Sequence, residues 1–278
     1  ALAKLMETMD ESGGQSKRAV DPRTEAMLRS LGYISGDPSP PAGDGPLIDP
    51  KDRLGLWRKI ESGLTMFSLG DDAGALEFFR KALAEDDGIP ILYDHICWSY
   101  IRLNQFERAE QTYRNAIERG FDSARLRANL GLVYYRLGKF AKAENELRLA
   151  LKLEERSVTA HYRLADVYRA TASYSKAAEH YRRVLELDSG YVWAANGLGM
   201  TRAMMGKNDE ALAAFRDAVR IAPEMAPGHL ILAVQLVRMK RFTEAIEAYE
   251  KFLDLSSVAE YARQRELATA AIKRLRGQ

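Results

Sequence analysis

The four histidines and the single cysteine are the residues of this chain that could ligate a metal or attack a substrate. They are His95, His161, His180, His229 and Cys97. A zinc site needs a second histidine or a carboxylate at short spacing on the same helix face, and none of the four histidines has one. A cysteine nucleophile needs a neighbouring base, and none is evident near Cys97. We therefore expect no catalytic residue, no metal site and no cofactor, and we interpret these side chains as packing residues.

Other kinds of chemistry are also disfavoured by the composition. The chain has no glycine loop that would hold a phosphate group. Its 41 basic and 39 acidic residues leave a net charge of +2, which argues against a nucleic-acid partner. The longest uncharged runs, 189–201 and 225–237, have 13 residues and are too short to span a bilayer. We expect a soluble protein of the bacterial cytoplasm or periplasm, and we interpret a start without an initiator methionine as the start of a fragment.

What organises the chain is a pattern that recurs every 34 residues without insertion or deletion. The windows are 56–89, 90–123, 124–157, 158–191, 192–225 and 226–259. The eighth place is small in every window: Gly63, Cys97, Gly131, Ala165, Gly199 and Ala233. The twentieth place is always alanine: Ala75, Ala109, Ala143, Ala177, Ala211 and Ala245. Two helices that pack closely need small residues where they touch, so each window predicts a pair of packed helices.

This pattern resembles the tetratricopeptide repeat (TPR), a 34-residue helix–turn–helix unit. The resemblance implies an all-α fold, a right-handed α-solenoid of six helix pairs, over 56–259. Residues 260–278 are expected to form a C-terminal capping helix with Tyr261, Leu267, Ala271 and Leu275 on its apolar side. We expect Phe252, which is bulky at a small-residue place, to loosen the last pair.

The N-terminal part of the chain has a different character. Residues 1–34 predict a short helical segment, and 35–55 form a linker rich in proline and glycine that leads into the first helix. Residues 21–55, with Leu-Arg-Ser-Leu-Gly-Tyr at 28–33 and Asp-Pro-Lys-Asp at 49–52, resemble the C-terminal edge of sulfatase-like hydrolases of the alkaline phosphatase superfamily. The resemblance implies that residues 1–34 are the tail of an upstream catalytic domain. The nucleophile motif of that family, Cys/Ser-x-Pro-x-Arg, is missing around Cys97, so no active-site residue carries over. An ordinary helix and linker is the other interpretation.

The TPR resemblance also implies that the first helix of each pair lines a concave groove. Places 2, 5, 9 and 12 share one helical face, and place 13 lies beside it. The candidate groove residues are Trp57, Leu64, Phe67, Trp98, Ile101, Arg102, Arg125, Leu132, Tyr135, Arg136, Tyr162, Asp166, Arg169, Trp193, Asn196 and Met200. Aromatic residues and arginine are enriched at binding hot spots. The other interpretation is that some of these residues only pack one repeat against the next.

Two functional hypotheses follow. The first is a non-catalytic scaffold that binds a protein or peptide segment in its groove. The second is the accessory C-terminal region of a sulfatase-like hydrolase, with the upstream catalytic domain as a partner. Some TPR proteins hold a C-terminal carboxylate with lysine at place 5 and asparagine at place 9. Those places hold other residues here, so chaperone tails are not expected as ligands.

Overall fold

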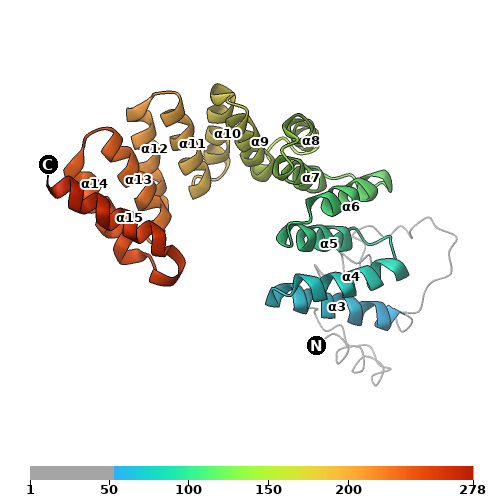
Figure 1. Ribbon diagram of the computed structural model, residues 1–278. Helices are drawn as coiled ribbons and strands as arrows, with labels where there is room; N and C mark the ends of the chain where they lie inside the picture. The colour runs from blue at the N-terminus through green and yellow to red at the C-terminus, as the bar shows by residue number, and fades with distance from the viewer. Residues whose placement is uncertain (1–52, 278) are drawn as a thin grey trace, which may run out of the picture. The chain divides into compact units, whose positions relative to one another are not determined.

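The computed structural model describes residues 53–277, which fall into two compact units (Figure 1). The described part of the first unit ends at Thr112 and the second unit begins at Tyr113. The first helices are α3 (Leu54–Leu69), α4 (Asp72–Glu85), α5 (Pro90–Arg102) and α6 (Phe106–Glu118). The second unit continues with α7 (Ala124–Arg136), α8 (Phe140–Leu153), α9 (Val158–Ala170), α10 (Tyr174–Leu187), α11 (Val192–Met204), α12 (Asn208–Ile221), α13 (Ala226–Arg238), α14 (Phe242–Leu255) and α15 (Val258–Arg276). The described residues contain no strand.

The all-α fold class is confirmed, and the helices follow the repeat. The helices α5, α7, α9, α11 and α13 begin at Pro90, Ala124, Val158, Val192 and Ala226, one 34-residue interval apart. The segment predicted at 1–34 and most of the linker at 35–55 lie outside the described residues.

Each turn between the two helices of a pair contains one residue with a left-handed backbone. These residues are Gly70, Asn104, Gly138, Ala172, Gly206 and Lys240, with φ between 56° and 84°. A Cβ makes this conformation unfavourable, so glycine fits best. Ala172 and Lys240 adopt it without being glycine or asparagine, so these two turns carry backbone strain.

The small eighth place receives a large side chain from the second helix of the same pair. A Cβ placed on Gly131 would lie 2.6 Å from Cγ of Leu147, and one on Gly199 would lie 2.5 Å from Cε1 of Phe215. The absence of a side chain at Gly131 and Gly199 therefore lets the two helices of these pairs approach closely, as the sequence predicts.

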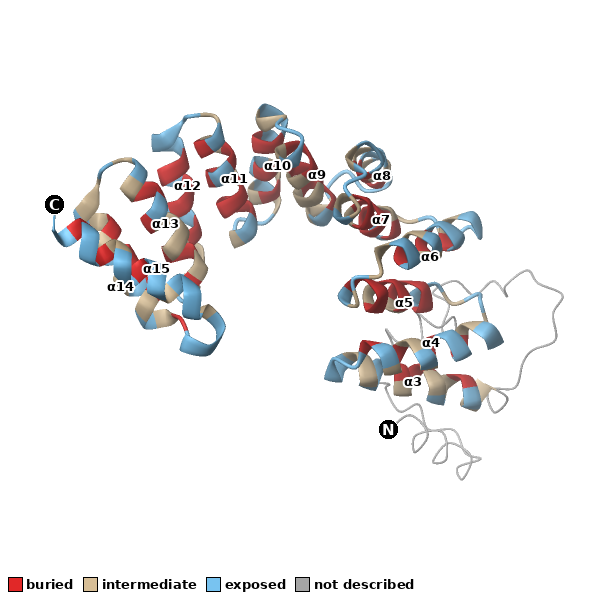
Figure 2. Cartoon of the chain, in the orientation of Figure 1, coloured by how far each residue is buried: buried red, intermediate tan, exposed pale blue. Residues whose placement is uncertain are grey.

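Within the second unit, the first helices of three successive pairs, α7, α9 and α11, are neighbours. Helix α7 contacts α9, and α9 contacts α11, in addition to the contacts within each pair. Buried residues run along the sides of these helices that face other helices, and the outward sides are exposed (Figure 2). The same face of α7, α9 and α11 therefore forms one continuous surface.

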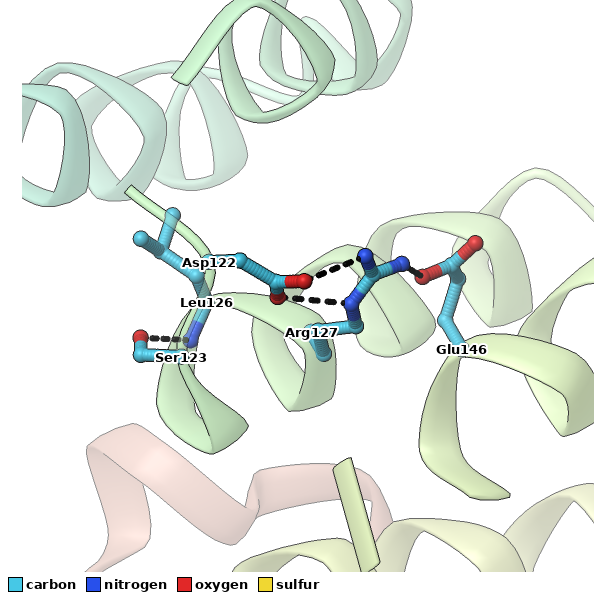
Figure 3. A network of polar contacts seen from close by, with 5 residues as sticks. All are labelled: Asp122, Ser123, Leu126, Arg127 and Glu146. Carbon is cyan, nitrogen blue, oxygen red and sulfur yellow. Dashed lines mark hydrogen bonds and ion pairs between the residues drawn. The ribbon is translucent and has the colours of Figure 1, made fainter. Parts of the chain in front are cut away.

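The start of α7 is fixed by a polar network (Figure 3). Arg127 donates two hydrogen bonds of 2.7 Å to the carboxylate of Asp122 and a third of 2.7 Å to Glu146 on α8. These bonds hold the pKa of Asp122 below its ordinary value. Ser123 caps the helix by accepting a 3.2 Å hydrogen bond from the amide of Leu126. Helix α7 is thus locked both to the preceding loop and to its partner helix.

A side chain at the fourth place ties several pairs to the loop before them. The Tyr93 hydroxyl donates to the carbonyl of Asp87 at 3.1 Å. His161 Nε2 lies 3.0 Å from the carbonyl of Glu155, and His229 Nε2 lies 2.8 Å from that of Pro223. Because a carbonyl can only accept, both imidazoles carry their proton on Nε2 here.

The C-terminal helix α15 packs on α14, and three of the four residues predicted for its apolar side meet the core: Leu275 is buried, and Tyr261 and Ala271 are half-buried. Ala268, Ile272 and Leu275 are buried, whereas Leu267 is 63% exposed. Tyr261 has a non-helical backbone (φ −119°, ψ 26°), so α15 is kinked there. Phe252 is fully buried and meets the Tyr261 ring edge-on at 6.0 Å, so this side chain is accommodated by the capping helix.

Candidate functional site

A cavity of about 320 Å³ opens on the face shared by α7 and α9. Its lining residues are Leu132, Tyr135, Thr159, Tyr162, Arg163, Asp166 and Tyr191. Four of them, Leu132, Tyr135, Tyr162 and Asp166, are among the residues predicted for the groove. The regular spacing of α7 and α9 brings these four together.

Tyrosine rings form one wall of the cavity. The Tyr162 ring lies 5.1 Å from the Tyr191 ring and 6.0 Å from the Tyr181 ring. Burial, helped by the charge of Asp166, raises the pKa of the Tyr162 hydroxyl above its ordinary value, and burial raises that of Tyr191. These hydroxyls therefore stay protonated at neutral pH and can donate hydrogen bonds.

The carboxylate of Asp166 is held by two neighbours. The Tyr181 hydroxyl donates to Asp166 Oδ1 at 2.5 Å, and Arg169 Nη2 donates to the same oxygen at 3.1 Å. Arg169 Nε also donates to the Tyr181 hydroxyl at 3.2 Å. Asp166 and Arg169, both predicted as groove residues, thus form a closed network with a buried tyrosine that fixes where the carboxylate points.

Arg163 is the second charged residue of the cavity, and it was not among the predicted groove residues. Its Nη1 donates to the side-chain oxygen of Asn129 on α7 at 2.6 Å. Burial lowers the pKa of Arg163, while the nearby hydroxyls of Tyr113, Tyr191 and Tyr162 act in the opposite direction. The site therefore holds a guanidinium surrounded largely by hydroxyl groups.

The corresponding side of α11 is apolar and exposed. Trp193 is 52% exposed, Met200 37% and Met204 51%, and Val234 on α13 is 47% exposed. Trp193 and Met200 are seven residues apart and share one helix face. The predicted residue Asn196 is buried, so it presents little surface to a ligand.

Arg125 and Arg136 are exposed at the two ends of α7. They are the remaining residues of the second unit that were predicted for the groove.

In the first unit, the predicted groove residues differ in their contacts and exposure. Arg102 donates to the carbonyl of Phe67 at 3.2 Å, pairs with the buried Asp72 at 3.0 Å, and lies over the Phe67 ring at 4.8 Å. Ile101 is buried, Trp57 and Trp98 are half-buried, and Leu64 is 38% exposed.

A larger hollow of about 370 Å³ lies along α8. Its lining residues are Ala141, Glu144, Asn145, Arg148, Leu149 and Lys152. They all belong to one helix and include no aromatic side chain, which makes the hollow a shallow surface feature. We therefore place the candidate site at α7 and α9.

The residues first considered for catalysis are packed. His161 Nδ1 lies 2.9 Å from His180 Nδ1, and Cys97 is buried with its Sγ 3.7 Å from the carbonyl of Ala109. Over residues 53–277, histidines, cysteines and carboxylates nowhere gather in threes that could hold a metal ion. No helix in the same range is long and apolar enough to cross a membrane.

Comparison with solved structures shows TPR folds. A Cut9–Hcn1 hetero-tetramer of the APC/C matches 82% of this chain at 17% identity and a TM-score of 0.66, and this chain spans 44% of that one. A tetratricopeptide repeat protein from Parabacteroides merdae matches 80% at 20% identity and a TM-score of 0.61, over 92% of its own length. YrrB, described as a TPR protein with an unusual peptide-binding site, matches 66% at 22% identity and a TM-score of 0.50, over 90% of its length. At these identities the likeness shows the fold.

Family assignment comes from the sequence. No curated protein matches the chain significantly. A tetratricopeptide repeat family model matches residues 98–153, 128–192 and 197–260, which together span more than half of the chain. With the 34-residue helix pairs and the small residues between them, this match shows that the chain belongs to the tetratricopeptide repeat family.

Proposed function

We propose that the second unit binds a segment of a protein partner along the face formed by α7, α9 and α11. The observation that carries the proposal is the cavity lined by Leu132, Tyr135 and Tyr162, with the exposed Trp193 on the next helix of the same face. Tyrosine, tryptophan and arginine dominate binding hot spots, and an exposed apolar surface with a polar border is typical of an interaction site.

The family supports a scaffold role. TPR repeats are suited to protein–protein interaction and are generally non-catalytic. A peptide-binding site is described for YrrB, which has the same fold. A face built from three neighbouring, packed helices can bind an extended segment with little rearrangement, which would limit the entropy lost on binding.

The proposal is tested by selecting peptides from a random phage-displayed library on the purified chain and measuring affinities by fluorescence polarisation. Trp193→Ala is expected to weaken the selected peptides about tenfold or more, as for a hot spot worth at least about 1.4 kcal/mol. Because Trp193 is half exposed, helicity and melting temperature should stay the same.

The matched control is Leu153→Ala, which removes a 55% exposed apolar side chain from the end of α8. It should leave peptide affinity unchanged. The proposal would be contradicted if the selection enriched no peptide. It would also be contradicted if Trp193→Ala and Tyr162→Ala both left the peptide affinities unchanged.

The relation to a sulfatase-like hydrolase stays a prediction. It depends on residues 21–55, most of which lie outside the described residues. The coding sequence upstream of Ala1 decides it: a Cys/Ser-x-Pro-x-Arg motif with metal-binding aspartates and histidines would support this relation.

A further inference from the structure

We propose that the bound segment is acidic and that one of its carboxylates enters the tyrosine cavity beside Arg163. This inference rests on the proposed function, because it specifies the ligand of the same site. It is carried by the polar groups of the cavity, by the charges of the surrounding helix faces and by the size of the cavity.

Most polar groups that line the cavity are hydrogen-bond donors. Besides the Arg163 guanidinium, these are the hydroxyls of Tyr135, Thr159 and Tyr191, whereas the Tyr162 hydroxyl is already engaged with the carboxylate of Asp166. Among the chemical groups of a peptide ligand, a carboxylate accepts the most hydrogen bonds, so it fits a cavity lined with hydrogen-bond donors. The acceptor in the lining, Asp166, already receives hydrogen bonds from Tyr181 and Arg169.

The charges on the face around the cavity have the sign that favours an acidic segment. The helix faces of α7 and α9 that border it carry the arginines Arg125, Arg136, Arg163 and Arg169 and the carboxylate of Asp166, and Asp188 adds a second carboxylate near Tyr191. The formal charge of this face is therefore positive. A positive face speeds the encounter with an acidic segment and disfavours a basic one.

A cation is a poor alternative ligand, although three tyrosine rings could surround one. Rings that bind a cation attract it through their faces. Here the Arg163 guanidinium lies in the same cavity and would repel a second positive charge, while Asp166 is already paired with Arg169. The tyrosines therefore act as hydroxyl donors and as an apolar wall.

The size of the cavity indicates one side chain of a peptide. Its volume of about 320 Å³ is at the low end of ligand pockets, which measure roughly 300–1,000 Å³. The exposed side chains of Trp193 and Met200 on α11 offer a neighbouring place for an apolar residue of the same segment. The expected ligand thus combines an acidic residue with a large apolar residue.

The test compares peptides selected on the whole chain with amide peptides, in which the shared aspartate or glutamate is replaced by asparagine or glutamine. Peptides enriched from a random dodecapeptide library should share aspartate or glutamate at one position and a large apolar residue nearby. Replacing that acid by asparagine or glutamine should weaken binding about tenfold. Raising the salt from about 50 mM to about 500 mM should weaken the acidic peptide more than the amide peptide.

Variants of the chain assign the effect to Arg163. Arg163→Gln should weaken the acidic peptide about tenfold and leave the amide peptide nearly unchanged, whereas Arg163→Lys should recover part of the loss. Arg220→Gln removes an exposed arginine from α12 and should change neither affinity. Tyr191→Phe, which removes only a hydroxyl, is the second variant in case Arg163→Gln does not fold.

The outcomes separate the inference from the proposed function. The acidic anchor is overturned if the enriched peptides share no acidic residue. It is also overturned if Arg163→Gln and Tyr191→Phe both lower the affinities of the acidic and the amide peptide equally. Either result leaves peptide binding in place. A selection that enriches nothing overturns both.

Discussion

The contact between Gly131 and Leu147 makes a sharp prediction about stability. A Cβ on Gly131 would lie 2.6 Å from Leu147 Cγ and 2.9 Å from Cδ2, closer than packed atoms can approach. Overpacking of this kind costs about 1–3 kcal/mol, while alanine gains about 1 kcal/mol over glycine in a helix. We therefore expect Gly131→Ala to lower the free energy of unfolding by up to about 2 kcal/mol.

A second substitution reverses the sign of this effect. Leu147→Ala alone leaves a cavity and should cost about 2–5 kcal/mol. In that background the clash is gone and the new methyl group fills part of the cavity, so adding Gly131→Ala should raise stability. The coupling energy between the two substitutions should be about 1–3 kcal/mol.

The assay is urea unfolding of the whole chain, followed by circular dichroism, with the slope of the transition compared between variants. Gly228→Ala is the matched control, because a Cβ there meets only Val219 Cγ2 at 3.7 Å, an ordinary contact. It should stabilise the protein by up to about 1 kcal/mol. The packing argument would be refuted if the stability changes of Gly131→Ala and Leu147→Ala were additive within about 0.5 kcal/mol. It would also be refuted if Gly131→Ala stabilised the wild-type protein.

Three further predictions concern other contacts. Arg102→Ala removes the partner of the buried Asp72 and should lower the free energy of unfolding by about 1–3 kcal/mol, measured by thermal or urea unfolding. Arg102→Lys should lower it less. An Arg102→Ala variant with unchanged stability would contradict this prediction. Lys240→Gly relieves a left-handed backbone (φ 59°) and should stabilise by about 1 kcal/mol, so a lower melting temperature would count against it. Burial lowers the pKa of both His161 and His180, so the unfolded chain takes up protons more readily, and stability should fall as the pH drops below about 6.5. His180→Gln should show a shallower loss of stability between about pH 7 and pH 5, and an equal slope would reject the histidine pair as its cause.

The fold could be predicted from the sequence because its period survives without insertions. Small residues at the eighth and twentieth places mark where helices touch, and the first helices of five pairs begin at the same place of the repeat. The face of α15 could be predicted in part, because Tyr261, Ala271 and Leu275 pack against the core whereas Leu267 is exposed. Ala268 is buried instead, since it lies on the same helix face as Ile272 and Leu275.

The candidate site was only partly predictable. Leu132 and Tyr162 follow from helical spacing alone. Tyr191 lies in the loop before α11, where no periodic pattern marks a functional side chain. Asn196 is at a predicted groove place but is buried, because its neighbour Gly197 lets α11 approach the Tyr181 ring of α10 closely. The burial of such a side chain depends on the distance between two packed helices, and the sequence of one helix does not specify that distance.

The left-handed turn residues point to how the chain arose. In the first, third and fifth pairs they are glycines, Gly70, Gly138 and Gly206, and in the second, fourth and sixth they are Asn104, Ala172 and Lys240. The twenty-fourth place alternates in step: Phe79, Leu147 and Phe215, then Tyr113, Tyr181 and Tyr249. The hydrogen bond from the fourth place to a preceding carbonyl belongs to Tyr93, His161 and His229, all in even-numbered pairs.

This alternation is what tandem duplication of a two-pair unit of 68 residues, twice 34, would leave behind. The unit of inheritance is then twice the unit of folding. Shortening the gene by 68 residues would keep every odd pair next to an even pair, whereas shortening it by 34 would join two pairs of the same kind at the new boundary. Natural variation in the length of such arrays should therefore occur in steps of two helix pairs.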